Sequence, residues 1–236
     1  MGANCMLDKQ KIQKNFQKSL ETYEENALVQ NSMAKKICQL IPSKKFNKIL
    51  EIGSYTGLLT KKIVAKTEFE DYLAIDIIDS SCYATKISPK IRFQKADIEF
   101  FTTQDKFDLI VSNASLQWCE SFEKVIKKII SFLAPSGVFV FSVFGERNFI
   151  EIKDVFNLQL NYPSPENILK INNNIQIKEE IMKLKFENPL ELMRHIKLTG
   201  VNSLSSKRIT KKQLQMLQEK HNCSLTYHPM YVVIKK

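Results

Sequence analysis

Long apolar runs are missing from this chain of 236 residues. No uninterrupted apolar stretch approaches the roughly 18 residues that a membrane-spanning helix needs. The first residues also lack a cationic stretch followed by an apolar core, which is the pattern of a secretory signal. We therefore expect a soluble, cytoplasmic protein that does not contact a membrane.

Cysteine and histidine are both scarce. The five cysteines are scattered without a Cys-x-x-Cys pair, so the sequence predicts reduced thiols and neither a disulfide framework nor a zinc site. The three histidines do not have the spacing of metal ligands, and we expect no metal in the reaction. The residues concerned are Cys5, Cys38, Cys82, Cys119, Cys223, His195, His221 and His228.

Acidic residues are fewer than basic ones, since 25 Asp and Glu against 35 Lys and Arg give a net charge of +10. This balance raises the encounter rate with an acidic partner, which is either a nucleic acid or an acidic carrier protein. One local cluster is formed by Lys207, Arg208, Lys211 and Lys212. The alternative is that the lysine-rich composition serves no partner and the charges are solvated.

The most informative segment is Lys48–Gly57, an apolar strand that runs into Glu51 and a glycine-containing turn. A turn of this kind brings backbone N–H groups close to a nucleotide-like ligand, and glycines leave room for the approach. About 20 residues after Gly53 a second apolar strand ends in Asp76, where a Rossmann-like sheet holds ribose hydroxyls. The two features predict a nucleoside cofactor.

Apolar strands and amphipathic helices alternate along the chain. Five βα units in succession predict a doubly wound, Rossmann-like α/β sheet of about seven strands, mostly parallel, with an antiparallel C-terminal strand. After Phe144 the rhythm changes, and residues 157–177 read as a loop-rich lid. The predicted strands are 48–52, 72–77, 91–96, 107–113, 138–144, 181–186 and 225–234; the helices are one or two within 9–40, then 58–66, 80–85, 122–133, 189–198 and 211–220.

The length fits one domain with a sizeable core. We divide residues 1–236 into an N-terminal helical cap (1–45), a cofactor-binding core (46–150), a lid or substrate insert (151–180) and the C-terminal part of the sheet (181–236).

Several segments carry signatures in a specific order. Glu51-x-Gly53-x-x-x-Gly57, Asp76, Ala96-Asp97-Ile98, Phe107-Asp108-Leu109-Ile110 and Leu133-x-Pro135-x-Gly137 resemble the motifs of class I S-adenosylmethionine-dependent methyltransferases. A narrower set is similar to the malonyl-acyl-carrier-protein O-methyltransferases of biotin synthesis. It comprises Phe16-x6-Tyr23 with Gln30, Ser112-Asn113-x3-Gln117-Trp118-Cys119, Phe144-Gly145, Leu192–Asn202 and Leu225–His228.

The resemblance implies S-adenosylmethionine as cofactor and S-adenosylhomocysteine as product. It implies that Asp76 accepts hydrogen bonds from the ribose hydroxyls and that Asp97 accepts one from the adenine amino group. The alternative for Asp76 is a turn residue at the end of a strand, and the alternative for Asp97 is an Asx turn. Glu51 would orient the turn or the aminoacyl end. The remaining cofactor residues that it implies are Gly53, Ser54, Gly57, Ile77, Ile98 on the ring face and Asn113 near the methionine moiety.

The implied reaction methylates the free carboxylate of a malonyl thioester. That carboxylate is ionised at pH 7, so no residue needs to act as acid or base, and catalysis consists of alignment in a dry aromatic pocket. We expect Tyr23, Trp118 and Phe144 to position the reactants, with Phe149 as a further candidate. Each is equally compatible with an ordinary core.

Substrate binding is assigned to Tyr23, Arg147, Arg194 and His195, although Arg194 is also typical of a solvated helix. The expected partner is an acidic acyl carrier protein, or coenzyme A in its place, and nucleic acid is not expected. We expect a monomer.

One residue departs from the family pattern, because Tyr55 stands where glycine is usual in the cofactor turn. A positive φ there would cost about 1–2 kcal/mol. Two rival hypotheses stay open: a class I methyltransferase acting on RNA or another small molecule, and a scaffold that binds no cofactor.

Overall fold

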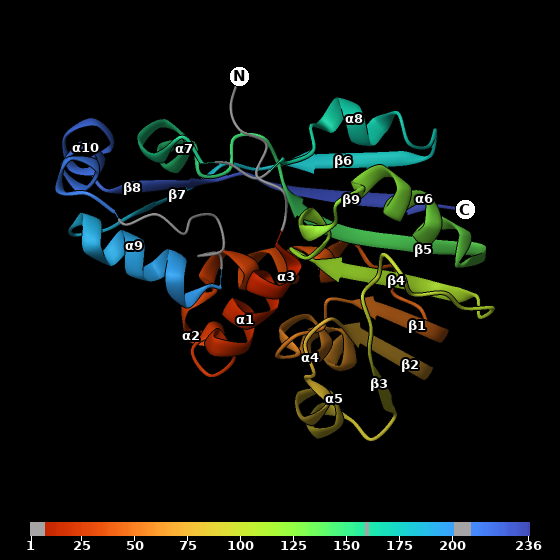
Figure 1. Cartoon of the computed structure of the whole chain (residues 1–236). Coiled ribbons are helices and arrows are strands. Elements are labelled where there is room, and N and C mark those ends of the chain that lie inside the picture. The colour runs from red at the N-terminus through yellow and green to blue at the C-terminus, as the bar shows by residue number, and fades with distance from the viewer. Residues whose placement is uncertain (1–7, 159–160, 201–208) are drawn as a thin grey trace.

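A seven-stranded sheet forms the centre of the computed structural model, which describes residues 8–158, 161–200 and 209–236. The strand order is β3-β2-β1-β4-β5-β9-β6 (Figure 1). The first five pair in parallel, whereas β9 is antiparallel to both β5 and β6. The predicted fold class, including the reversed C-terminal strand, is confirmed. The strands are β1 (Phe46–Ile52), β2 (Phe69–Asp76), β3 (Ile91–Lys95), β4 (Phe107–Asn113), β5 (Leu133–Phe144), β6 (Ile175–Glu179) and β9 (Pro229–Lys235).

Helices cover both faces of this sheet. On one face, α3 (Leu28–Leu40), α4 (Leu58–Lys66) and α5 (Ser81–Ile87) pack against Ile49 and Leu109. On the other, α6 (Phe122–Ser131) and α8 (Pro165–Leu169) pack against Leu50 and Ile110. Successive residues of a strand point to opposite faces of the sheet. Because helices cover both faces, the central strands are apolar on both sides.

A smaller lobe lies beyond one end of the sheet (Figure 1). Its two-stranded sheet pairs β7 (Met182–Lys185) with β8 (Ser224–Tyr227), and α7 (Ile150–Phe156), α9 (Pro189–Leu198) and α10 (Lys211–His221) surround it. A third apolar core joins this lobe to α3 through Val29 and Met33. Within the described ranges, no helix is both long and apolar enough to cross a membrane.

The N-terminal helices α1 (Lys9–Ser19) and α2 (Tyr23–Asn26) reach the loops that follow the parallel strands. The Gln13 amide donates to the carbonyl of Ile77 at 3.4 Å, just after β2. Since parallel strands end at one edge of the sheet, α1 covers the region where ligands bind in doubly wound folds.

Two expectations about the later strands need correction. Residues 182–185 do form a strand, but β7 pairs with β8 and not with the main sheet. The sixth strand of the main sheet is β6, inside the segment expected to be loop, where Ile175 and Ile177 pair with β9. The last strand is divided into β8 and β9 at His228, whose buried ring contacts Glu179. The lid role of residues 151–180 stays a prediction.

Candidate functional site

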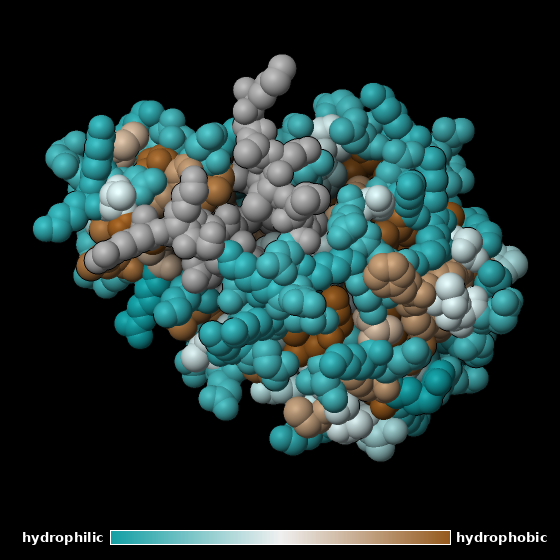
Figure 2. Space-filling model, viewed as in Figure 1, coloured by the Kyte–Doolittle hydropathy of each residue, from teal (hydrophilic) through white to brown (hydrophobic). Residues whose placement is uncertain are grey.

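The loops after β1, β2 and β3 surround a depression that we call the turn pocket. It consists of two overlapping cavities of about 500 and 490 Å³. Figure 2 shows apolar side chains reaching the surface in the middle of this otherwise mostly hydrophilic face. Six of the residues expected to hold a cofactor line the pocket, namely Gly53, Asp76, Ile77, Asp97, Ile98 and Asn113.

Asp76 ends β2 with its carboxylate facing this pocket and 7% of the residue exposed. Oδ1 accepts from the backbone N–H of Ile78 at 2.8 Å, and Oδ2 accepts from that of Tyr55 at 2.9 Å. Burial raises the pKa of Asp76 to about 6, although the N–H groups of Ile78 and Tyr55 oppose the shift. Each oxygen keeps a further lone pair, so the carboxylate can accept from two neighbouring hydroxyls.

Asp97 follows β3 and forms the Asx turn that was its alternative interpretation. Its Oδ1 accepts from the N–H of Glu99 at 2.9 Å. Its Oδ2 lies 2.6 Å from Nζ of Lys9, which also forms an ion pair with Glu99. The role of Asp97 toward an adenine amino group stays a prediction.

Glu51 lies behind the turn and is 1% exposed. Its Oε2 accepts from the Thr60 hydroxyl at 2.6 Å and from the Tyr72 hydroxyl at 2.5 Å. Burial raises the pKa of Glu51 to about 7, against the lowering effect of those two hydroxyls. Glu51 thereby ties β1 to α4 and β2, and its role in orienting the turn or the aminoacyl end of a cofactor stays a prediction.

The glycines of the turn are required by packing within the protein. Gly53 has φ +74°, and a Cβ there would lie 2.2 Å from Oγ of Ser115. Gly57 has φ +80°, and a Cβ would meet the Ile87 side chain at 2.3 Å. Ser54 is buried and does not line the turn pocket in the described part of the chain. Gly57 does not line it either, so the cofactor roles of Ser54 and Gly57 stay predictions.

A second cavity of about 360 Å³, which we call the aromatic pocket, adjoins the first. Phe16, Tyr23, Ala114 and Trp118 line both pockets and form their common wall. The expected positioning residues Tyr23, Trp118 and Phe144 meet here, as does Phe149. The described residues that line this pocket include no charged side chain.

The polar groups of the aromatic pocket are neutral. The Asn148 amide donates to the Tyr162 hydroxyl at 2.9 Å and accepts from the N–H of His228 at 3.3 Å. The Gln117 amide donates to the Ala114 carbonyl at 2.6 Å, and its buried Oε1 has no partner in the described ranges. Sequence reasoning named neither Asn148 nor Tyr162 as a site residue, although Tyr162 lies in the predicted lid or substrate insert. Gln117 stood in the family signature, which was the available signal.

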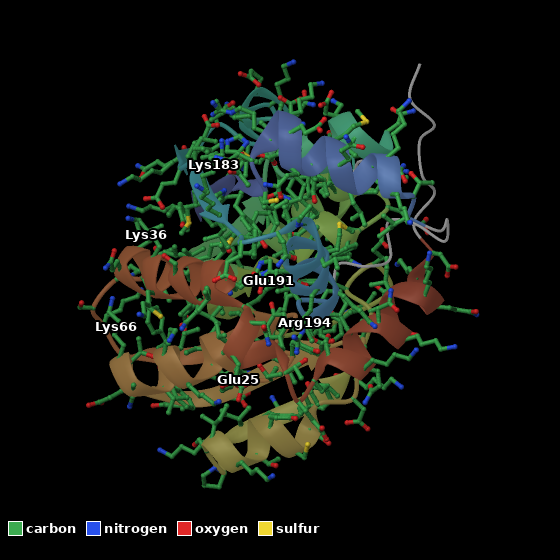
Figure 3. The ribbon with its side chains drawn as sticks, turned by 90° about the vertical axis from the view of Figure 1, so that its left-hand side faces the viewer. Glu25, Lys36, Lys66, Lys183, Glu191 and Arg194 are labelled. Atoms are coloured by element: carbon green, nitrogen blue, oxygen red, sulfur yellow. The ribbon has the colours of Figure 1, made fainter. Side chains whose placement is uncertain are left out.

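The expected cationic residues lie elsewhere. Arg147 is exposed; its N–H donates to Nδ1 of His228 at 3.2 Å and its guanidinium is 3.5 Å from the Glu179 carboxylate. Arg194 lies on the exposed surface of α9 (Figure 3). Neither lines the turn pocket or the aromatic pocket in the described ranges, and their role in binding substrate stays a prediction.

His195 reaches the aromatic pocket only through another residue. Its Nε2 lies 2.8 Å from the hydroxyl of Tyr227, which lines the pocket, and burial lowers the pKa of the imidazole. Of the basic cluster, Lys211 and Lys212 begin α10 and are exposed, whereas Lys207 and Arg208 lie outside the described residues. Within the described ranges, no group of three or more His, Cys, Asp or Glu is arranged to hold a metal ion.

Comparison with known proteins places this geometry in a family. Residues 26–171, well over half of the chain, match the family model described as a methyltransferase domain. The malonyl-[acyl-carrier protein] O-methyltransferase of Calditerrivibrio nitroreducens is 34% identical over 239 residues, covering 94% of this chain and 95% of that protein. The chain belongs to the malonyl-[acyl-carrier protein] O-methyltransferase family. The Bacteroides thetaiotaomicron member is 31% identical over 259 residues, covering 98% of this chain and 99% of its own.

Solved structures show that this methyltransferase shares its fold with distant proteins. The YcgJ protein of Bacillus subtilis superposes with a TM-score of 0.64 at 12% identity, covering 87% of this chain and 98% of its own. The N-methyltransferase NodS of Bradyrhizobium japonicum, in complex with S-adenosyl-L-homocysteine, gives 0.53 at 15% identity, with coverages of 87% and 85%. These structures confirm the predicted fold, and the relatives confirm the family predicted from the motifs.

Three of the seven non-glycine residues with positive φ in the described ranges lie at the two pockets of this methyltransferase. Tyr55, Ala114 and Phe149 have φ of +44°, +49° and +58°, and each lines a pocket. A left-handed backbone conformation costs free energy for any residue other than glycine. Such a conformation persists where the surrounding structure enforces it.

Proposed function

We propose that this methyltransferase transfers a methyl group from S-adenosylmethionine to the free carboxylate of a malonyl thioester on an acyl carrier protein. Its product would be the malonyl methyl ester that primes pimeloyl synthesis for biotin. We propose a monomer that acts in the cytoplasm and does not act on nucleic acid. The curated relatives carry the name of this activity, which supports the proposal.

The residues of the turn pocket fit the cofactor. Asp76 offers two carboxylate oxygens with lone pairs to spare, which suits the two hydroxyls of a ribose. Ile77 and Ile98 offer apolar contacts for a ring, and Asp97 lies beside them. When bound, S-adenosylmethionine supplies an activated methyl group on a sulfonium centre.

The single observation that carries the proposal is the uncharged lining of the aromatic pocket in the described ranges. Such a lining contains no group able to deprotonate an alcohol or protonated amine. It suits an acceptor that is already nucleophilic, and a malonyl carboxylate is ionised at pH 7.

The aromatic wall supplies what remains for the protein to do. The faces of Tyr23 and Trp118 favour a cationic sulfonium, and the pocket excludes water from the carboxylate. Alignment of the reactants can contribute ~7–11 kcal/mol in the best cases. No step of this scheme needs a general base.

A matched pair of acceptors tests the function. The protein is incubated with S-adenosylmethionine and either malonyl or acetyl carrier protein, and the carrier is weighed by mass spectrometry. We expect a gain of one methylene unit on the malonyl form only, because acetyl has no carboxylate to attack. Malonyl-coenzyme A in parallel shows which acyl carrier is preferred.

Two outcomes would favour the rival hypotheses. Methylation of added RNA with malonyl carrier protein unchanged would indicate an RNA methyltransferase. No binding of S-adenosylmethionine by calorimetry, in a protein shown to be folded, would indicate a scaffold.

A further inference from the structure

Tyr55 is the residue that the proposed function leaves without a role. It lies between β1 and α4 with φ +44°, and its N–H holds Oδ2 of Asp76. A glycine could make the same backbone contact without the strain. The large side chain therefore needs an explanation of its own, because strained residues persist at functional sites where neighbouring contacts compensate.

The phenol of Tyr55 bonds to the last turn of α1. Its hydroxyl donates to the carbonyl of Phe16 at 2.6 Å and lies 3.1 Å from Oγ of Ser19. The final carbonyls of a helix lack partners within the helix, so the phenol meets one that is available. The Tyr55 side chain thus links the cofactor turn to α1, 39 residues back along the chain.

The same ring also orders the wall between the two pockets. It packs edge-on against Phe16 at 5.6 Å and against Tyr23 at 4.7 Å between ring centroids. Phe16 in turn packs edge-on against Trp118 at 5.6 Å. Three of the four residues shared by the pockets are therefore in contact with Tyr55 or with a residue that it holds.

The end of α9 closes against the same place. A Cβ on Gly200 would lie 2.7 Å from the ring of Phe16 and 3.1 Å from Oγ of Ser19. The backbone at Gly200, just after α9, is therefore in contact with α1. At its other end, α1 is anchored by the ion pair of Lys9 with Asp97. The helix consequently spans the turn pocket from Asp97 to Tyr55, with Ile12 and Phe16 in its lining.

We propose that Tyr55 is a positioning residue whose phenol latches α1 and α2 over the turn pocket, so that cofactor exchange requires this latch to open. The proposal rests on the proposed function for the identity of the cofactor. It assigns Tyr55 two effects: it slows release of the cofactor, and it holds Phe16 and Tyr23 where the two substrates meet.

Tyr55→Phe tests the latch, because it keeps the ring and removes the hydroxyl. Tyr231→Phe is the matched control. Tyr231 lies on β9, its hydroxyl donates to the Glu180 carboxylate at 3.1 Å, and it lines neither pocket in the described ranges. The full-length protein is followed by hydrogen exchange of α1 without ligand and by stopped-flow release of S-adenosylhomocysteine. We expect both rates to rise about 3- to 10-fold in Tyr55→Phe, which corresponds to one neutral hydrogen bond, and neither in the control.

Steady-state kinetics separate positioning from general loosening. We expect Tyr55→Phe to lower kcat at saturating substrates, while the melting temperature stays as close to wild type as that of Tyr231→Phe. Tyr55→Gly relieves the backbone strain and removes the ring, and we expect still faster release from it.

Unchanged α1 exchange and unchanged release in Tyr55→Phe would overturn the latch, as would slower release from Tyr55→Gly. Failure of the wild type to bind S-adenosylhomocysteine would instead contradict the proposed function. Hydrogen exchange of α1 in the ligand-free protein would then still decide whether Tyr55 holds the helix.

Discussion

Replacing Asp76 by alanine is the sharpest perturbation of the turn pocket. Its carboxylate is expected to accept two ribose hydroxyls, and hydrogen bonds to a charged acceptor are stronger than neutral ones. Losing both should weaken cofactor binding by about 2–4 kcal/mol, or ~30- to 1,000-fold in Kd. Calorimetry with S-adenosylhomocysteine measures the change directly.

The same replacement also affects the fold, because Asp76 accepts from the N–H groups of Tyr55 and Ile78. A buried donor left without its acceptor costs about 1–3 kcal/mol, so the melting temperature should fall as well. Asp79→Ala is the control, since it removes an exposed carboxylate that bonds only to Ser81 in the described contacts. An Asp76→Ala protein that is folded and binds with wild-type affinity would refute the assignment of Asp76 to the cofactor.

Three further predictions concern pH, charge and alignment. Burial raises the pKa of Asp76 to about 6, so its carboxylate protonates below that pH. Calorimetry should therefore show the affinity for S-adenosylhomocysteine falling about tenfold per pH unit below pH 6 in wild type but not in Asp76→Ala. Reversing Lys211 and Lys212 to Glu should raise KM for the carrier-bound substrate, with the difference shrinking in a salt series; equal KM values would mean a merely solvated surface. Trp118→Ala should lower kcat about 100-fold through misalignment, whereas Phe100→Ala, at an 80% exposed position, should not.

The raised pKa of Asp76 also makes the stability of the fold depend on pH. Folded Asp76 holds its proton up to about pH 6, whereas the ordinary value is 3.8, so the folded state binds more protons between these values. Its contribution to stability therefore decreases as pH rises through this window.

Local signals account for the elements that sequence predicts well. The helix at Pro189–Leu198 is predicted to the residue because Asn188 caps it, accepting from the N–H of Glu191 at 3.0 Å, and Pro189 takes the first position. Strand β6 escapes such reasoning, because its alternation from Ile175 to Ile177 is too short to distinguish from a loop. What makes it a strand is pairing with β9, more than 50 residues away.

The candidate site divides in the same way. Asp76 ends one parallel strand and Asp97 follows the next. Because the ends of parallel strands meet at one edge of the sheet, their meeting in one pocket can be predicted. The contact of Tyr55 with Phe16 cannot, because no local pattern tells where α1 packs. Arg147 shows the same limit, since only the fold turns its side chain toward Glu179.

Strand β9 has a consequence for biosynthesis. It separates β5 from β6, with Val138 paired to Lys235 on one side and Ile175 paired to Ile234 on the other. Until residues 229–235 have left the ribosome, β5 and β6 each present an open edge, and such edges invite aggregation. A nascent chain stalled before residue 229 should therefore be a chaperone substrate, whereas a chain whose residues 229–235 are free to pair should complete the sheet by joining β5 to β6.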